Sequence, residues 1–126
     1  MLKFITRMFL LFSLTISAAF AIGDVYDQAA FDKLNNTGES VLVFVHASWC
    51  PTCKAQSAAL EELFAMPSYK KIHVLRLNFD TQKKELHVFK AKWQSTLIVF
   101  KGGKEVTRVT AETDKNAIEA LLKQVI

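Results

Sequence analysis

Cys50 and Cys53 are the only cysteines in the 126-residue chain, and two residues separate them. A disulfide between them would close a very short loop, which removes little entropy from the unfolded chain and adds little stability. A zinc site needs about four ligands, and His46, His73 and His87 show no paired spacing of the zinc-finger kind. The pair is therefore better explained by thiol chemistry than by a structural role.

The residues around the two cysteines predict how the sulfurs differ. A buried strand over residues 41–45 (VLVFV) leads into the motif, and a helix begins at Pro51, where a missing N–H costs nothing. Cys50 then falls at the N-cap, so its thiolate faces free N–H groups and the positive end of the helix dipole. We expect a lowered pKa for Cys50, which makes it the nucleophile. Cys53 lies one turn later on the same face, more buried, and suits the resolving thiol.

The rest of the sequence predicts helices and strands in the order β-α-β-α-β-α-β-β-α. The two long strands joined through a helix should be parallel, with a right-handed crossover, and the last two form an antiparallel hairpin across Gly102-Gly103. The expected strands are 25–26, 41–45, 72–79, 96–101 and 104–110. The expected helices are 27–35, 51–65 with Ala55, Ala58, Ala59 and Leu63 facing inward, 81–90, and a last helix capped by Thr113. This pattern predicts an α/β domain with a mixed sheet and helices on both faces.

The composition is typical of one folded domain. About half of the residues (51%) are apolar and low-complexity runs are absent, which excludes a disordered chain. The net charge is +4, with 16 basic and 12 acidic residues and no basic cluster, so we expect no nucleic-acid binding. A length of 126 residues leaves room for one domain.

Residues 1–21 predict a signal peptide. Two basic residues precede an apolar core over residues 8–16 (MFLLFSLTI), which is shorter than the roughly 20 residues that span a bilayer. Ala19 and Ala21 supply the small residues that signal peptidase requires. We therefore expect cleavage after Ala21, and a mature domain of residues 22–126 that is either located in the periplasm or secreted. An uncleaved membrane anchor is the alternative.

The segment around the cysteines, VLVFVHASWCPTCK, resembles that of the thioredoxin superfamily. The sequence LNFD at the end of strand 72–79 and the sequence TLIVFKGG in the hairpin extend the resemblance over nearly all of residues 22–126. The resemblance implies a thioredoxin-like three-layer α/β/α sandwich with a mixed central sheet. It also implies that Cys50 attacks substrate, that Cys53 resolves the mixed disulfide, and that Trp49 belongs to the rim that meets substrate.

Two positions before the motif depart from the family pattern. Phe44 stands six residues before Cys50, where thioredoxins have a buried aspartate that shuttles a proton for the resolving thiol. A phenyl ring cannot accept a proton, so Cys53 must lose its proton to water or another group, and we expect slower reductive turnover near neutral pH. His46 either lowers the pKa of Cys50 as a protonated imidazole or, as we favour, hydrogen-bonds to backbone at the strand end. The other residues expected to modulate the sulfurs are Pro51, Thr52 and Lys54.

A third departure lies in the segment Gln94-Ser95-Thr96, where Ser95 replaces the cis-proline of the family. A cis bond before a residue other than proline costs about 2.5–4 kcal/mol. Either packing holds the Gln94–Ser95 bond cis, or the loop is trans and has a different shape. By the resemblance, Gln94 pairs its backbone with a substrate strand, and Ser95 and Thr96 complete the predicted substrate-binding residues with Trp49. Ser95 also removes the ring that normally keeps metals away from the thiols.

These patterns favour an exported thiol–disulfide oxidoreductase that acts on protein thiols and disulfides. It needs no organic cofactor, because two sulfurs carry both electrons. We expect a reductant, because the chain lacks the inserted helical domain of dedicated periplasmic oxidases. We also expect a monomer that receives its electrons from a membrane protein. One alternative is a binding protein whose Cys50 and Cys53 hold Cu(I) or a cluster shared between two chains. Another is a redox-inert adaptor.

Overall fold

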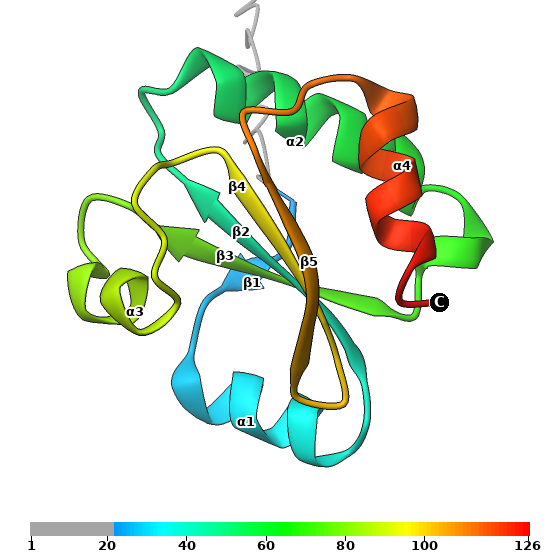
Figure 1. Ribbon diagram of the computed structural model, residues 1–126. Helices are drawn as coiled ribbons and strands as arrows, with labels where there is room; N and C mark the ends of the chain where they lie inside the picture. The colour runs from blue at the N-terminus through cyan, green and yellow to red at the C-terminus, as the bar shows by residue number, and fades with distance from the viewer. Residues whose placement is uncertain (1–21) are drawn as a thin grey trace, which may run out of the picture.

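The computed structural model describes residues 22–126, and the predicted leader with its cleavage site lies outside the described residues. A five-stranded sheet in the order β1-β3-β2-β4-β5 forms the middle of the molecule (Figure 1). Its strands are β1 (Asp24–Val25), β2 (Ser40–His46), β3 (Ile72–Asn78), β4 (Thr96–Lys101) and β5 (Lys104–Thr110). β2 runs parallel to β3 and antiparallel to β4, and β4 and β5 form the predicted hairpin. The sheet is therefore mixed, as the sequence predicts.

Helices cover both faces of this sheet (Figure 1). They are α1 (Gln28–Asn36), α2 (Pro51–Phe64), α3 (Lys83–Val88) and α4 (Lys115–Lys123), with a 3-10 helix over Pro67–Tyr69. α2 and α4 share one buried cluster with Leu42 and Phe44, whereas α1 and α3 share another with Val43 and Val45. This arrangement confirms the three-layer α/β/α sandwich. Within residues 22–126, no helix has both the length and the apolar character needed to cross a membrane.

Strand β2 is buried on both faces and leads directly into the two cysteines. The side chains of Val41 to Val45 are all 0% exposed, and successive residues point into opposite clusters. Burying a valine, leucine or phenylalanine side chain contributes about 1.5–3 kcal/mol. A strand held this firmly at the centre of the sheet gives the residues that follow it a fixed starting point.

Two helices begin at residues other than those predicted. The carboxylate of Asp114, not the hydroxyl of Thr113, accepts the N–H of Ala117 (2.9 Å) and caps α4. The predicted helix over residues 81–90 is shorter, because the side-chain oxygen of Asn78 accepts two backbone N–H groups that follow β3. That asparagine holds the first part of the segment in a turn.

The inward face of α2 also differs from the prediction. Ala55 and Ala58, predicted to face inward, are exposed. The buried residues of the helix are Cys53, Gln56, Ala59, Leu60 and Leu63. They repeat at the helical spacing counted from Cys53, so the cysteine and not the alanines marks the buried face.

Candidate active site at the start of helix α2

The two cysteines lie at the carboxyl end of β2, where the chain turns into α2. Cys50 donates its N–H to the carbonyl of Ala47 (3.2 Å), and this bond closes the turn. Both sulfurs are free thiols in this structure. The turn therefore places Cys50 at the last position before the helix and Cys53 inside its first turn.

Cys50 is the N-cap residue of α2, and Pro51 occupies the first helical position, as predicted. The Cys50 sulfur accepts the backbone N–H of Cys53 (3.1 Å). Burial alone would raise the pKa of Cys50, but hydrogen bonds from the Cys53 thiol, the Ser95 hydroxyl and the N–H groups of Cys53 and Thr52 lower it below its usual value. The negative charge of a thiolate is therefore stabilised at this sulfur.

Cys53 has the opposite environment. Its side chain is 0% exposed, and burial, followed by the hydrogen bond to the Cys50 sulfur, raises the pKa of Cys53. A thiol with a raised pKa is protonated at neutral pH and stays inactive until its neighbour has reacted. The two sulfurs thus differ in the direction that an attacking and a resolving cysteine require.

Ser95 brings a hydroxyl to both sulfurs. Its Oγ lies 3.1 Å from the Cys50 Sγ and 3.0 Å from the Cys53 Sγ, and the residue is 3% exposed. No peptide bond within residues 22–126 is cis, so the loop has the trans form, and Ser95 adopts a positive φ of 61°. Its N–H donates to the carbonyl of Val45 (2.8 Å), a bond that a proline could not make.

The backbone of Ser95 is held from two further sides. Its carbonyl accepts the N–H of Ala111 (2.9 Å) and the side-chain amide of Gln56 (2.9 Å). The same Gln56 amide donates to the carbonyl of Glu112 (2.9 Å). Gln56 is a fully buried polar residue that the sequence analysis missed, although its place three residues after Cys53 put it on the buried face of the helix.

Trp49 lies on an exposed rim beside the nucleophile. Its side chain is 58% exposed, and its indole N–H donates to both carboxylate oxygens of Asp80 (2.9 and 3.2 Å). A shallow pocket of about 160 Å³ is lined by Ser48, Trp49, Cys50, Pro51 and Lys54. Trp93, which the sequence analysis did not single out, is 65% exposed and stands two residues before Ser95. The predicted rim at Trp49 is therefore solvent-exposed and has an oriented indole.

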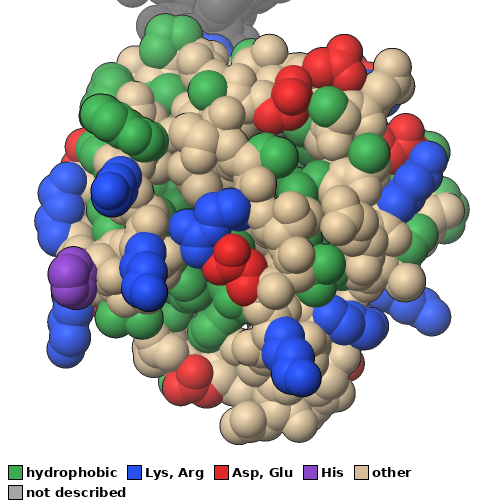
Figure 2. Space-filling model, in the orientation of Figure 1, with side chains coloured by type: hydrophobic (Ala, Val, Ile, Leu, Met, Phe, Trp, Pro, Cys, Tyr) green, Lys and Arg blue, Asp and Glu red, His purple; other side chains and the backbone are tan. Residues whose placement is uncertain are grey.

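The surface next to this rim is basic. Figure 2 shows Lys and Arg side chains gathered around α3 and the segment that follows it, beside hydrophobic side chains. The exposed lysines of this region are Lys83, Lys84, Lys90 and Lys92. A substrate segment that meets the rim from this side approaches a positively charged surface.

Two other predicted substrate-binding residues, Gln94 and Thr96, are less exposed than Trp49. Gln94 is half-buried. Thr96 is buried, and its hydroxyl donates to the carbonyl of Trp93 (2.9 Å) and lies 3.0 Å from the hydroxyl of Thr110. The Thr96 side chain therefore holds the loop in shape, while its role toward substrate stays a prediction.

Phe44 and His46 both lie in β2, and their rings pack edge to face at 5.2 Å between centroids. Phe44 is 0% exposed and belongs to the core. Burial, followed by the nearby charge of Arg76, lowers the pKa of His46, so its imidazole is neutral at pH 7. A neutral imidazole carries no positive charge, so His46 does not lower the pKa of Cys50 in that way. The groups that stabilise the Cys50 thiolate are the Cys53 thiol, the Ser95 hydroxyl and the helix N–H groups.

The described residues 22–126 contain no group of three or more His, Cys, Asp and Glu side chains able to hold a metal. A metal bound at this site would therefore have the two cysteine sulfurs as its Cys, His, Asp or Glu ligands from residues 22–126. Metal binding by Cys50 and Cys53 stays a prediction.

Comparison with known proteins agrees with the geometry. The thioredoxin family model matches residues 24–124. A thioredoxin of Alicyclobacillus acidocaldarius subsp. acidocaldarius is 34% identical over 98 residues, which cover 78% of this chain and 92% of the relative. A thioredoxin of Chlamydia muridarum is 36% identical over 84 residues, 67% of this chain and 80% of the relative. The crystal structure of Trxlp from Edwardsiella tarda EIB202 matches with a TM-score of 0.77 and 43% identity, over 79% of this chain and 96% of that chain. The chain therefore belongs to the thioredoxin family of protein-disulfide oxidoreductases.

Proposed function

We propose that this protein is an exported reductase that reduces disulfides in protein substrates through Cys50 and Cys53. The observation that carries the proposal is the difference between the two sulfurs. Hydrogen bonds lower the pKa of Cys50 at the start of α2, whereas burial raises the pKa of Cys53 one turn later. A pair of thiols with this difference reacts in a defined order.

The reaction proceeds in two exchanges. The Cys50 thiolate attacks one sulfur of the substrate disulfide, so that the other substrate sulfur leaves with the electron pair and takes a proton from solvent. Cys53 then loses its proton to solvent and attacks the Cys50 sulfur, which releases the second substrate sulfur. Two electrons pass from the dithiol to the substrate, and a Cys50–Cys53 disulfide remains.

The rim around Cys50 suits a protein substrate rather than a small molecule. The pocket at the nucleophile is shallow, about 160 Å³, and the exposed indole of Trp49 borders it. An extended segment lying across this rim could pair with the backbone of Gln94, as the family resemblance implies. Specificity then rests on surface contacts along the segment and not on a deep cavity.

Export and the direction of electron flow rest on the sequence. The basic start, short apolar core and small residues of positions 1–21 support a signal peptide and a location in the periplasm or outside the cell. A reductant in an oxidising compartment needs a membrane protein that relays electrons to it, and we propose such a partner for a monomeric domain.

The test is a redox titration of the purified protein. The Cys50–Cys53 disulfide is followed in glutathione buffers by alkylation and mass, with Trp49 fluorescence as a second probe and Cys50→Ser as the control that cannot form the bond. We expect a potential of about −270 to −220 mV, the range of reducing members such as thioredoxin and glutaredoxin. A value of about −120 mV would make the protein an oxidant. Failure to form a reversible disulfide would contradict the proposal and favour metal binding.

A further inference from the structure

The resolving step needs a group that stabilises the Cys53 thiolate. Cys53 is 0% exposed, so bulk water does not solvate the charge of its thiolate. The buried polar side chains within residues 22–126 are Ser40, Gln56, Ser95 and Thr96, and no carboxylate is among them. Phe44, at the position where thioredoxins have an aspartate, is itself buried in the core. Of these polar side chains, the one whose contacts include the Cys53 sulfur is Ser95.

The Ser95 hydroxyl lies almost equally close to both sulfurs, at 3.1 Å from Cys50 and 3.0 Å from Cys53. A serine hydroxyl has one proton and rotates freely about its C–O bond, so it can donate to either sulfur without movement of the backbone. The backbone is fixed by its bonds to Val45, Ala111 and Gln56. The hydroxyl is therefore a single donor held between two acceptors.

We infer that Ser95 is a catalytic residue whose hydroxyl donates a hydrogen bond to Cys50 during attack and then to Cys53 during resolution. This inference rests on the proposed function. In the reduced protein the hydroxyl stabilises the Cys50 thiolate. Once Cys50 is bonded to substrate, its sulfur carries no charge, and the hydroxyl rotates toward Cys53.

The chemical balance of the resolving step is then complete. Cys53 gives its proton to solvent, and its thiolate is stabilised by the Ser95 O–H. The Cys53–Cys50 bond forms as the bond from Cys50 to substrate breaks, and the electron pair leaves with the substrate sulfur. Ser95 keeps its proton throughout, so it returns to its starting state. Its hydrogen bond lowers the pKa of each cysteine in turn, in agreement with its effect on both thiols.

The experiment is a stopped-flow reaction of the reduced protein with DTNB (5,5′-dithiobis(2-nitrobenzoic acid)) across a range of pH. Attack by Cys50 releases the first coloured thiolate, and attack by Cys53 on the mixed disulfide releases the second in a phase independent of protein concentration. Loss of the Ser95 donor raises the pKa of both thiols, so each phase needs a higher pH. We expect Ser95→Ala to move both pH profiles upward by about one unit, and to slow both phases at pH 7 by up to about tenfold.

Two further variants make the result decisive. Ser95→Gly also lacks the hydroxyl and accepts the positive φ of this position without strain, so it must show the same two shifts if the hydroxyl is responsible. Ser40→Ala removes a buried serine hydroxyl at the opposite end of β2 and must leave both profiles unchanged.

The outcomes separate this inference from the proposed function. Profiles of Ser95→Ala and Ser95→Gly that superpose on the wild type, with both phases present, would overturn the role of Ser95 and leave the dithiol mechanism intact. A shift in only the first phase would overturn the donation to Cys53. A wild-type protein that never shows the second phase would overturn both.

Discussion

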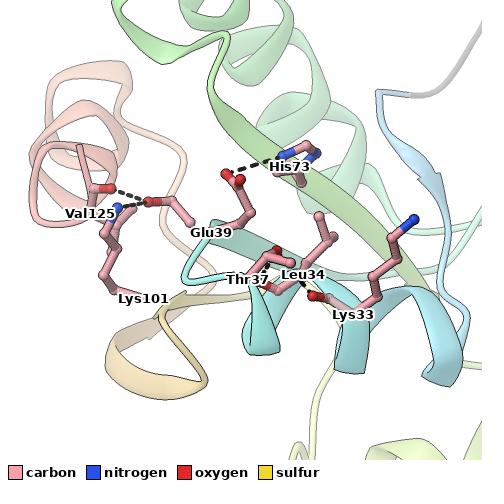
Figure 3. Close-up of polar contacts among 8 residues, drawn as sticks. Lys33, Leu34, Thr37, Glu39, His73, Lys101 and Val125 are labelled. Carbon is pink, nitrogen blue, oxygen red and sulfur yellow. Dashed lines mark hydrogen bonds and ion pairs between the residues drawn. The ribbon is translucent and has the colours of Figure 1, made fainter.

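Two buried serines lie at opposite ends of the same sheet, and they serve different purposes. Ser40 begins β2 and pairs in register with Lys101, whereas Ser95 precedes β4 near the other end of β2. Their exposed fractions are almost equal, 4% and 3%. The Ser40 hydroxyl donates to the carbonyl of Val125 and accepts from the Lys101 ammonium (3.1 Å). Dashed lines mark these two bonds at Val125 and Lys101 in Figure 3. The Ser95 hydroxyl contacts two reactive sulfurs instead.

The surroundings of the two serines extend the contrast. Near Ser40 the polar contacts join structural groups, including the Glu39 carboxylate and the His73 Nε2 at 3.6 Å (Figure 3). A pocket of about 380 Å³ lies there, lined in part by Ser40 and Lys101, and it is larger than the pocket at Cys50. The larger pocket contains no thiol, so its size does not mark the reactive site. Neither the burial of a serine nor the volume of the pocket beside it identifies the reactive site. The hydrogen-bond partners of each hydroxyl distinguish the two serines.

The largest effect on stability is expected from Phe44→Asp in β2, the strand that runs from Ser40 to the end of the sheet near Ser95. Phe44 is 0% exposed, and the change leaves a cavity and buries a carboxylate. We expect a loss of at least about 4 kcal/mol in the free energy of unfolding, measured by urea denaturation. Phe44→Leu, which keeps an apolar side chain, is the control and should lose less. A stable Phe44→Asp variant with faster turnover near neutral pH would show instead that the site accepts the carboxylate of other thioredoxins.

A smaller effect is expected from Gln56→Ala, which removes the support of Ser95. The variant loses the two hydrogen bonds that the buried Gln56 amide donates to the carbonyls of Ser95 and Glu112. We expect the free energy of unfolding to fall by about 2–3 kcal/mol. Ser57→Ala is the matched control, because the buried Ser57 Oγ has no hydrogen-bond partner among the described residues. Equal stabilities of the two variants would mean that Gln56 does not hold the Ser95 loop.

The smallest effect is expected from Ser40→Ala, which tests the structural side of the comparison. The variant loses the hydrogen bonds of one buried hydroxyl, so the free energy of unfolding should fall by about 1–2 kcal/mol. Its rate of insulin reduction should equal that of the wild type, because no reactive group lies nearby. A changed rate with unchanged stability would remove the distinction between the two serines.

The strands and the cysteine geometry follow from local sequence, which explains why they were predicted well. The apolar run at the centre of β2, Pro51 at the first helical position and the Gly102-Gly103 hairpin each leave one low-energy arrangement, and the structure contains all three. The role of Gln56 depends on the carbonyls of Ser95 and Glu112, which lie 39 and 56 positions further along the chain. No local pattern shows such a partner.

The shape of the Ser95 loop also depends on distant residues. The sequence left a cis or a trans bond open, and the choice rests on the carbonyl of Val45, which accepts the Ser95 N–H. The lowered pKa of His46 depends first on its burial and then on the charge of Arg76, a residue on the neighbouring strand. Contacts of this kind appear only once the sheet is assembled.

The order in which the two thiols react is tested by treating the fully reduced protein with a limiting amount of iodoacetamide across a range of pH and mapping the modified residue by mass. Hydrogen bonds at the start of α2 lower the pKa of Cys50, and burial raises the pKa of Cys53. The thiolate population at neutral pH therefore resides on Cys50. The expected result is modification of Cys50 alone at pH 7, with an inflection below the ordinary thiol pKa of about 8.5. Modification of Cys53 first, or of both cysteines at equal rates, would contradict it.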